Sequence, residues 1–149
     1  TRMNREQYER VLRDIARAGV YHAPQQGMGD LFAAAEASGF SICRIDLAPV
    51  RDKAALFEHV ATALEFPDWF GHNWDALADC LGDLSWLPAD GFLILLEHCD
   101  GFSTRHGGDF AMALQVFAAA AEAWRDERVP FWVLVDMHAD GIATLPGIE

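Results

Sequence analysis

Basic residues are missing from the middle of this sequence: between Ala54 and Thr104 there is no lysine or arginine. Over the full 149 residues the formal net charge is −12. Because phosphate binding needs clustered Lys and Arg, this balance disfavours direct binding of nucleic acid or of an anionic membrane surface. A surface that concentrates negative charge is expected to have a positively charged partner. The acids of the window are Glu58, Glu65, Asp68, Asp75, Asp79, Asp83, Asp90, Glu97 and Asp100.

Cysteines are few, and Cys43, Cys80 and Cys99 form no CxxC pair. We therefore expect free thiols in a reducing compartment and neither a disulfide framework nor a zinc site. The apolar segments 40–47 and 92–96 are too short to cross a bilayer, and the N-terminal residues show no apolar signal-peptide region. A cytoplasmic location is expected.

Internal repeats, low-complexity tracts and long linkers are also missing. Hydrophobic residues make up 52% of the sequence and charged residues 23%, which is typical of one globular domain with a real core. The charge is uneven, since the first nineteen residues hold five arginines against three acids. This asymmetry indicates either an electrostatic interaction surface or a well-solvated protein.

Hydrophobic periodicity predicts strands separated by helices. Such an alternation favours an α/β fold with a small central parallel sheet of three strands, or four if residues 20–23 add one. Gly19, Gly39 and Gly82 are expected to end helices, and Gly107-Gly108 is expected to be a turn. The predicted helices are 5–18, 30–38, 52–64, 73–81 and 110–124, and the predicted strands are 20–23, 40–47, 92–96 and 131–135.

The segment 66–81 is the most informative part of the chain. It is a Pro/Gly turn rich in aromatics, followed by a predicted helix that carries Asp75 and Asp79 one turn apart. Carboxylates at this spacing repel each other by a few tenths of a kcal/mol, and no basic neighbour in the sequence offsets the repulsion. Not all the aromatics of the turn can be buried, so we expect Trp69 to be exposed and Phe70 and Trp74 to pack in the core.

The same segment resembles the barstar family, the intracellular inhibitors of barnase-type ribonucleases. From Leu64 to Leu81 the sequence follows the pattern Leu-x-x-Pro-acid-aromatic-aromatic-Gly-x-Asn-x-Asp-Ala-Leu-x-Asp-Cys-Leu. The similarity extends from about Phe40 to Asp136. Residues 1–39 are then an N-terminal extension, with a helix and a strand-helix unit, and residues 40–149 a barstar-like domain with an extra tail after about 136.

The resemblance implies a stoichiometric inhibitor that blocks the active site of its partner without cofactor, metal or turnover. It places Asp79 as the central carboxylate facing a basic cleft, Asp75 as its acidic neighbour and Trp69 as the aromatic contact. The implied partner is a basic extracellular-type ribonuclease or a nuclease toxin, as in a bacterial antitoxin or immunity system, and not a small-molecule substrate. The expected partner-binding surface also includes Gly71, His72, Asn73, Ala78 and Asp83.

Two positions depart from the family pattern. Ala78 stands where the family has a Trp, and Ala119 stands where it has a contact Glu, although Glu122 follows one turn later. These departures leave open a second interpretation, a non-inhibitory acidic module that binds another basic protein.

Enzymatic alternatives are weaker. The spacing of His72, Asp75 and Asp79 is compatible with a metal site in a small hydrolase. His98 and Cys99 are adjacent after a predicted strand, but strand neighbours point to opposite faces, which disfavours a nucleophile-base pair. Glu97 is expected to be a paired polar strand end, and Cys80 a buried core residue. We therefore expect no catalytic residues.

Overall fold

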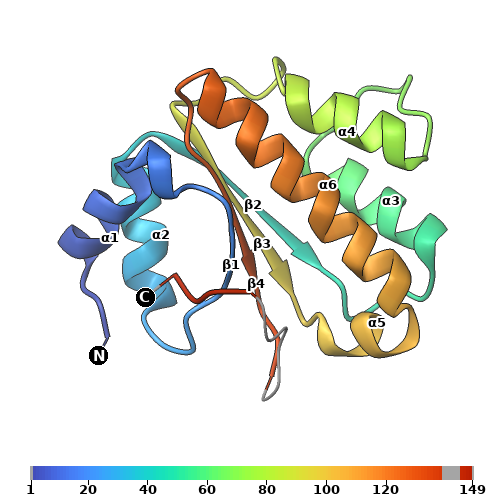
Figure 1. Cartoon of the computed structure of the whole chain (residues 1–149), viewed down its shortest axis with the longest axis horizontal. Helices are drawn as coiled ribbons and strands as arrows, with labels where there is room; N and C mark the ends of the chain where they lie inside the picture. Colours follow the sequence, from blue (N-terminus) through green and yellow to red (C-terminus); the bar gives the residue numbers. More distant parts are fainter. Residues whose placement is uncertain (1, 139–144, 149) are drawn as a thin grey trace.

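Four parallel strands form the centre of the fold, in the spatial order β1-β4-β3-β2 (Figure 1). The computed structural model describes residues 2–138 and 145–148. The predicted α/β class is confirmed, and of the two predicted strand numbers the sheet has four, because residues 20–22 form the additional strand. The strands are β1 (Val20–His22), β2 (Phe40–Asp46), β3 (Gly91–Glu97) and β4 (Phe131–Val135).

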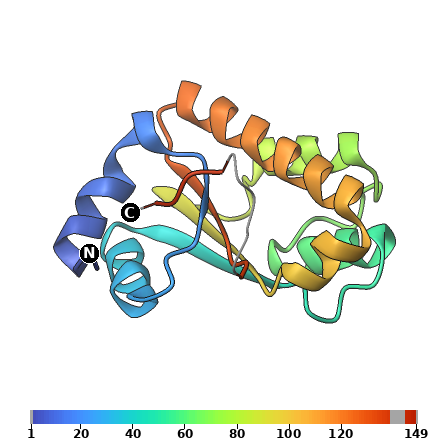
Figure 2. The same ribbon diagram turned by 60° about the horizontal axis from the view of Figure 1, so that its bottom comes forward.

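Helices cover both faces of the sheet (Figures 1 and 2). They are α1 (Arg5–Arg13), α2 (Met28–Ala37), α3 (Lys53–Ala63), α4 (Trp74–Asp83), α5 (Asp100–Arg105) and α6 (Gly107–Asp126). In β3, the side chains of Leu93 and Leu95 pack with α1 and α2, whereas those of Ile94 and Leu96 pack with α3 to α6. Strands that are buried on both faces have continuous apolar sequences, so β3 and β4 do not alternate between apolar and polar residues.

The layer formed by α1 and α2 lies on the face opposite α3 to α6 and comes entirely from residues 1–39. Tyr8, Leu12 and Leu31 are fully buried there against the sheet. The indole Nε1 of Trp132 in β4 donates to the Leu12 carbonyl at 3.0 Å, which ties the sheet to α1. A domain boundary at residue 40 stays a prediction, but the residues before it share a core with the sheet.

Part of the C-terminal tail returns to the sheet. The His22 amide donates to the Pro146 carbonyl at 2.8 Å, Gly147 pairs with His22, and Ile148 is buried beside α1 and α2. No sequence pattern predicts this segment, because the contact is long-range. Residues 139–144 of the predicted tail lie outside the described residues.

Two predicted helix ends are wrong. α1 ends at Arg13, and a separate 3₁₀ turn spans Ile15–Arg17, because Asp14 is extended and Ala18 must reach the core. α4 continues through Gly82 to Asp83, and the left-handed residue after it is Leu84, with φ 47°. Leu84 is 1% exposed, so burial of its side chain holds a backbone conformation that favours glycine elsewhere.

The region between β3 and β4 also differs from the prediction. α5 was not predicted, because six residues are too few to show a helical period. Gly107 and Gly108 are not a turn but the first residues of α6. Among the residues that the structure describes, no helix is long and apolar enough to cross a membrane.

Candidate functional site

α4 begins where the sequence predicts because Asn73 caps it. The Asn73 Oδ1 accepts from the Ala76 amide at 2.8 Å, and its Nδ2 donates to the Gly71 carbonyl at 3.2 Å. The cap satisfies one of the four free N–H groups of the first turn, and the second bond fixes the preceding loop. Asn73 and Gly71 therefore set the direction in which the helix leaves the aromatic turn.

One side of α4 is anchored to the core. Leu77, Cys80 and Leu81 are fully buried, as predicted for Cys80. The indole Nε1 of Trp124 in α6 donates to the Leu81 carbonyl at 2.7 Å. Because three buried side chains and this bond hold the helix, its opposite side is presented on a rigid support.

The opposite side of α4 carries a row of exposed carboxylates, Asp75, Asp79 and Asp83, which we call the acidic face; Ala78 is exposed within it. Among the described residues, no hydrogen bond or ion pair reaches any of these three side chains. The negative charges of Asp79 and Asp83 also act on Cys80, on the core side of the helix. Burial raises the pKa of the Cys80 thiol, and the charges of Asp79 and Asp83 raise it further.

Aromatic packing fixes the turn before α4. The ring of Phe70 packs edge-on against Phe66 and Phe57, with centroid distances of 5.0 and 6.1 Å, and Trp74 packs on Phe57 at 4.9 Å. Phe70 is 5% exposed, whereas Trp69 is 64% exposed. The predicted exposure of Trp69 and burial of Phe70 are confirmed, whereas Trp74 is partly buried and packs against the core.

His72 faces α3 and not the acidic face. Its Nε2 lies 2.7 Å from the Glu58 Oε1, and its Nδ1 lies 3.0 Å from the Phe70 carbonyl oxygen. These contacts hold His72 at φ 52°, a left-handed conformation that costs energy for a residue other than glycine. No three His, Cys, Asp or Glu side chains in the described ranges are placed to hold a metal ion, so His72 is not brought together with Asp75 and Asp79.

The sequence did not single out Glu58 as a partner of His72. The available signal was weak: Glu58 is one of the acids in the window without basic residues, on a helix predicted to lie just before the turn. No rule based on sequence spacing predicts this contact, because it joins α3 to a loop that is distant in the sequence.

On α6, Ala119 and Glu122 are both exposed, so a partner could contact either position.

The residues after β3 do not form a nucleophilic site. The His98 Nδ1 lies 2.8 Å from the Asp46 Oδ1, and no contact joins it to Cys99 among the described residues. Cys99 is fully buried, its thiol donates to the Leu96 carbonyl, and burial raises its pKa to about 12. Glu97 pairs with Arg44 at 2.6 Å, as expected of a paired strand end. The thiol is therefore held protonated and away from a base.

Replacing the cap tests how much of α4 depends on it. We expect Asn73→Ala to lower the free energy of unfolding by about 1 kcal/mol, because the first turn of α4 loses its side-chain acceptor. Asn73→Asp keeps the acceptor and is the matched control. Thermal or denaturant unfolding of the three proteins measures the difference, and equal stability of Asn73→Ala and the wild type would contradict the role of the cap.

Comparison with known proteins connects this geometry to a family. Residues 40–136 match the family model described as Barstar (barnase inhibitor), which spans more than half of the chain. The matched range includes the whole aromatic turn and α4, and it leaves out α1, β1 and α2. A comparison with curated proteins found no match. The chain belongs to the barstar family, whose members are non-enzymatic inhibitors of barnase-type ribonucleases.

Proposed function

We propose that this protein inhibits a basic ribonuclease or nuclease toxin stoichiometrically, by placing α4 and the turn before it in the active site of that enzyme. Asp79 is the central contact and Asp75 its neighbour, with Trp69 packing on the enzyme beside them. Gly71, His72, Asn73, Ala78 and Asp83 complete the contact surface. Since the barstar family is intracellular, the proposal includes a cytoplasmic location.

The observation that carries the proposal is the unpartnered acidic face. A ribonuclease cleft is lined by cationic side chains that hold the phosphates of RNA, and carboxylates at fixed spacing on a helix match that charge. Asp75, Asp79 and Asp83 are exposed on a helix whose other side is buried. Because the helix is already ordered, binding does not require it to fold, which lowers the entropic cost of association.

Titration into a ribonuclease assay tests the proposal. We expect the cleavage rate of a barnase-type ribonuclease to fall linearly with added protein and to reach its minimum at one inhibitor per enzyme. A curved titration with residual cleavage at a large excess of inhibitor, or no effect at micromolar concentrations, would count against this partner.

Trp69 offers a second, independent test. We expect Trp69→Ala to weaken the complex by about 2 kcal/mol, because large aromatics at interface centres contribute this much. The free energy of unfolding should stay within about 0.5 kcal/mol of the wild type, since the side chain is 64% exposed. Trp69→Phe is the matched control. A variant that binds normally, measured by calorimetry or by inhibition, would remove Trp69 from the interface.

A non-inhibitory acidic module remains the second candidate. Ala78 presents only a methyl group in the middle of the acidic face, and Ala119 on α6 lacks a carboxylate. Both reduce the contact expected from the family pattern. This candidate predicts a complex with a basic protein in which nuclease activity survives, and the assay above, run beside a direct binding measurement, separates the two.

A further inference from the structure

The two edges of the sheet differ. The outer edge of β1 is paired by residues 146 and 147, whereas β2 ends the sheet on the other side. The Gly39 carbonyl accepts from Asp90, and the Leu47 amide donates to Glu97, so both residues bond toward β3. Since backbone groups of alternate residues in a strand point to opposite sides, those of residues 42, 44 and 46 point outward.

These outward groups face no neighbouring strand within the described ranges, because β2 pairs with β3 alone, and no turn or loop backbone bonds to Ile42, Arg44 or Asp46 there. Figure 2 shows β2 along the outer margin of the sheet, between α2 and α3. An open strand edge is a template for pairing with another strand, and proteins that avoid such pairing cover or distort the edge. No bulge distorts β2, since its register with β3 is continuous. Its edge carries the charged side chains of Arg44 and Asp46, which limit pairing to a strand of complementary charge.

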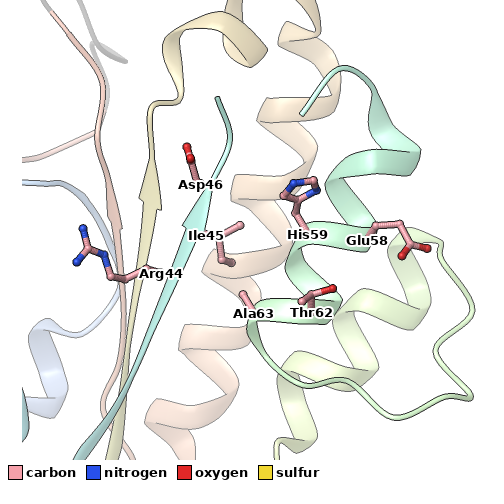
Figure 3. Close-up of a pocket in the computed structure, with 7 residues that line it drawn as sticks. All are labelled: Arg44, Ile45, Asp46, Glu58, His59, Thr62 and Ala63. Atoms are coloured by element: carbon pink, nitrogen blue, oxygen red, sulfur yellow. The ribbon is translucent and has the colours of Figure 1, made fainter. Parts of the chain in front are cut away.

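A groove of about 350 Å³ lies between β2 and α3 (Figure 3). Ile45 and His59 point into it, and Glu58 points away. Besides His59 and Glu58, α3 lines the groove with the small side chains of Thr62 and Ala63. α3 therefore stands back from the strand and leaves room along its edge.

The charges on the edge identify what fits it. Arg44 pairs with Glu97, and Asp46 with His98, in the same chain. Both side chains still remain exposed, at 57% and 52%, and are two residues apart on the same face of β2. If β2 pairs antiparallel with a second copy of itself about a twofold axis at Ile45, Arg44 of each chain lies opposite Asp46 of the other. Both residues have outward backbone groups, so each such pair also exchanges two hydrogen bonds.

We propose that this protein forms a twofold dimer through antiparallel pairing of β2 with β2, with Arg44 facing Asp46 of the second copy twice. The contact is self-complementary, as a twofold interface requires, and it joins two sheets into one of eight strands. The net charge of −12 on each chain opposes association, but salt screens it beyond about 8 Å at 0.15 M, whereas the facing charges are in contact.

Charge exchange tests the pairing. By sedimentation equilibrium we expect the wild type to approach twice the 16.5 kDa of one chain as its concentration rises to about 100 μM. Arg44→Asp places two carboxylates opposite each other, and Asp46→Arg places two cations opposite each other, so each variant alone should associate at least tenfold more weakly. An equimolar mixture of the two variants should dimerise again, because both facing pairs are then of opposite charge.

Matched controls use α1, which is not part of the β2 edge. Arg10→Asp and Asp14→Arg, alone or mixed, should leave the wild-type dimer unchanged. Amide hydrogen exchange adds a measurement without mutation: the Arg44 amide should exchange more slowly as the concentration rises. Circular dichroism and thermal melting check that Arg44→Asp, which lies beside Glu97, remains folded.

Three results would each overturn the proposal: a monomeric wild type at all concentrations with a fast Arg44 amide, single variants that dimerise normally, or a mixture that stays monomeric. A slow Arg44 amide in a monomeric protein that has captured an extended peptide would also overturn it and assign the edge to another chain. The test does not depend on the proposed inhibition, because it requires no nuclease.

Discussion

Asp79→Ala is expected to abolish tight inhibition while leaving the protein folded. In the proposed complex the Asp79 carboxylate is buried against cationic side chains, and its removal leaves those charges unpaired. Loss of one partner from such a pair weakens binding by about 2–5 kcal/mol, roughly thirty- to several-thousand-fold. Charge pairs of barnase and barstar are among the measurements behind this range, so the magnitude is carried over from the family.

The free protein should show little change. Asp79 is exposed and has no partner among the described residues, so its replacement should alter the free energy of unfolding by less than about 0.5 kcal/mol. Removing one carboxylate from the acidic face also relieves repulsion from Asp75 and Asp83. This variant should therefore lose affinity for the partner without losing stability, whereas replacement of a merely structural residue would lower the stability as well.

Two comparisons sharpen the measurement. Asp79→Asn keeps the shape and removes the charge, so it should lose most of the affinity and show a weaker dependence of the association rate on salt. Asp14→Ala removes an exposed carboxylate from the opposite side of the sheet and should inhibit as the wild type does. If Asp79→Ala inhibits normally, Asp79 is not the central contact.

Deletion of residues 1–39 is expected to have the largest effect on stability. The deleted layer covers Leu93, Leu95, Trp132 and Leu134, all 5% exposed or less. Each large apolar side chain contributes about 1.5–3 kcal/mol when buried, and a domain of this size has a total stability of only about 5–15 kcal/mol. The remaining chain, although it contains the whole family match, should be insoluble or unfolded.

Trp132→Ala is the graded form of the same test. It removes a fully buried side chain and its hydrogen bond to the Leu12 carbonyl, and we expect a loss of about 3–5 kcal/mol by denaturant unfolding. Trp132→Phe, which keeps most of the volume, should lose less. A chain of residues 40–149 that is soluble, unfolds cooperatively and inhibits would show instead that the barstar-like part is independent and the extension is an accessory.

The local features of the site were predictable from the sequence, because they follow from spacing. Asn73 before the apolar period predicted the cap of α4, and the 3.6-residue period separated Asp79 from Cys80. The crowded turn predicted that Trp69 would be exposed and Phe70 buried. In each case, neighbours within one or two helical turns decide the outcome.

The contacts that the sequence did not reveal join distant segments. His72 meets Glu58 across a loop, and the His22 amide meets the Pro146 carbonyl across more than a hundred residues. Leu84 adopts a left-handed conformation that its residue type does not favour, because its side chain is required in the core. No local rule predicts such contacts, since tertiary packing selects them.

Three tryptophan side chains cap the C-terminal ends of three helices by hydrogen bonds. The indole N–H groups of Trp132, Trp86 and Trp124 donate to the carbonyls of Leu12, Leu64 and Leu81, which lie in the last turn or at the cap of α1, α3 and α4. Carbonyls at helix ends have no partner within the helix. In a proton NMR spectrum these three indole signals should persist in heavy water, whereas that of Trp69 disappears at once. The indole signals of Trp132, Trp86 and Trp124 therefore report whether the helices remain packed, and the indole signal of Trp69 reports the binding of a partner.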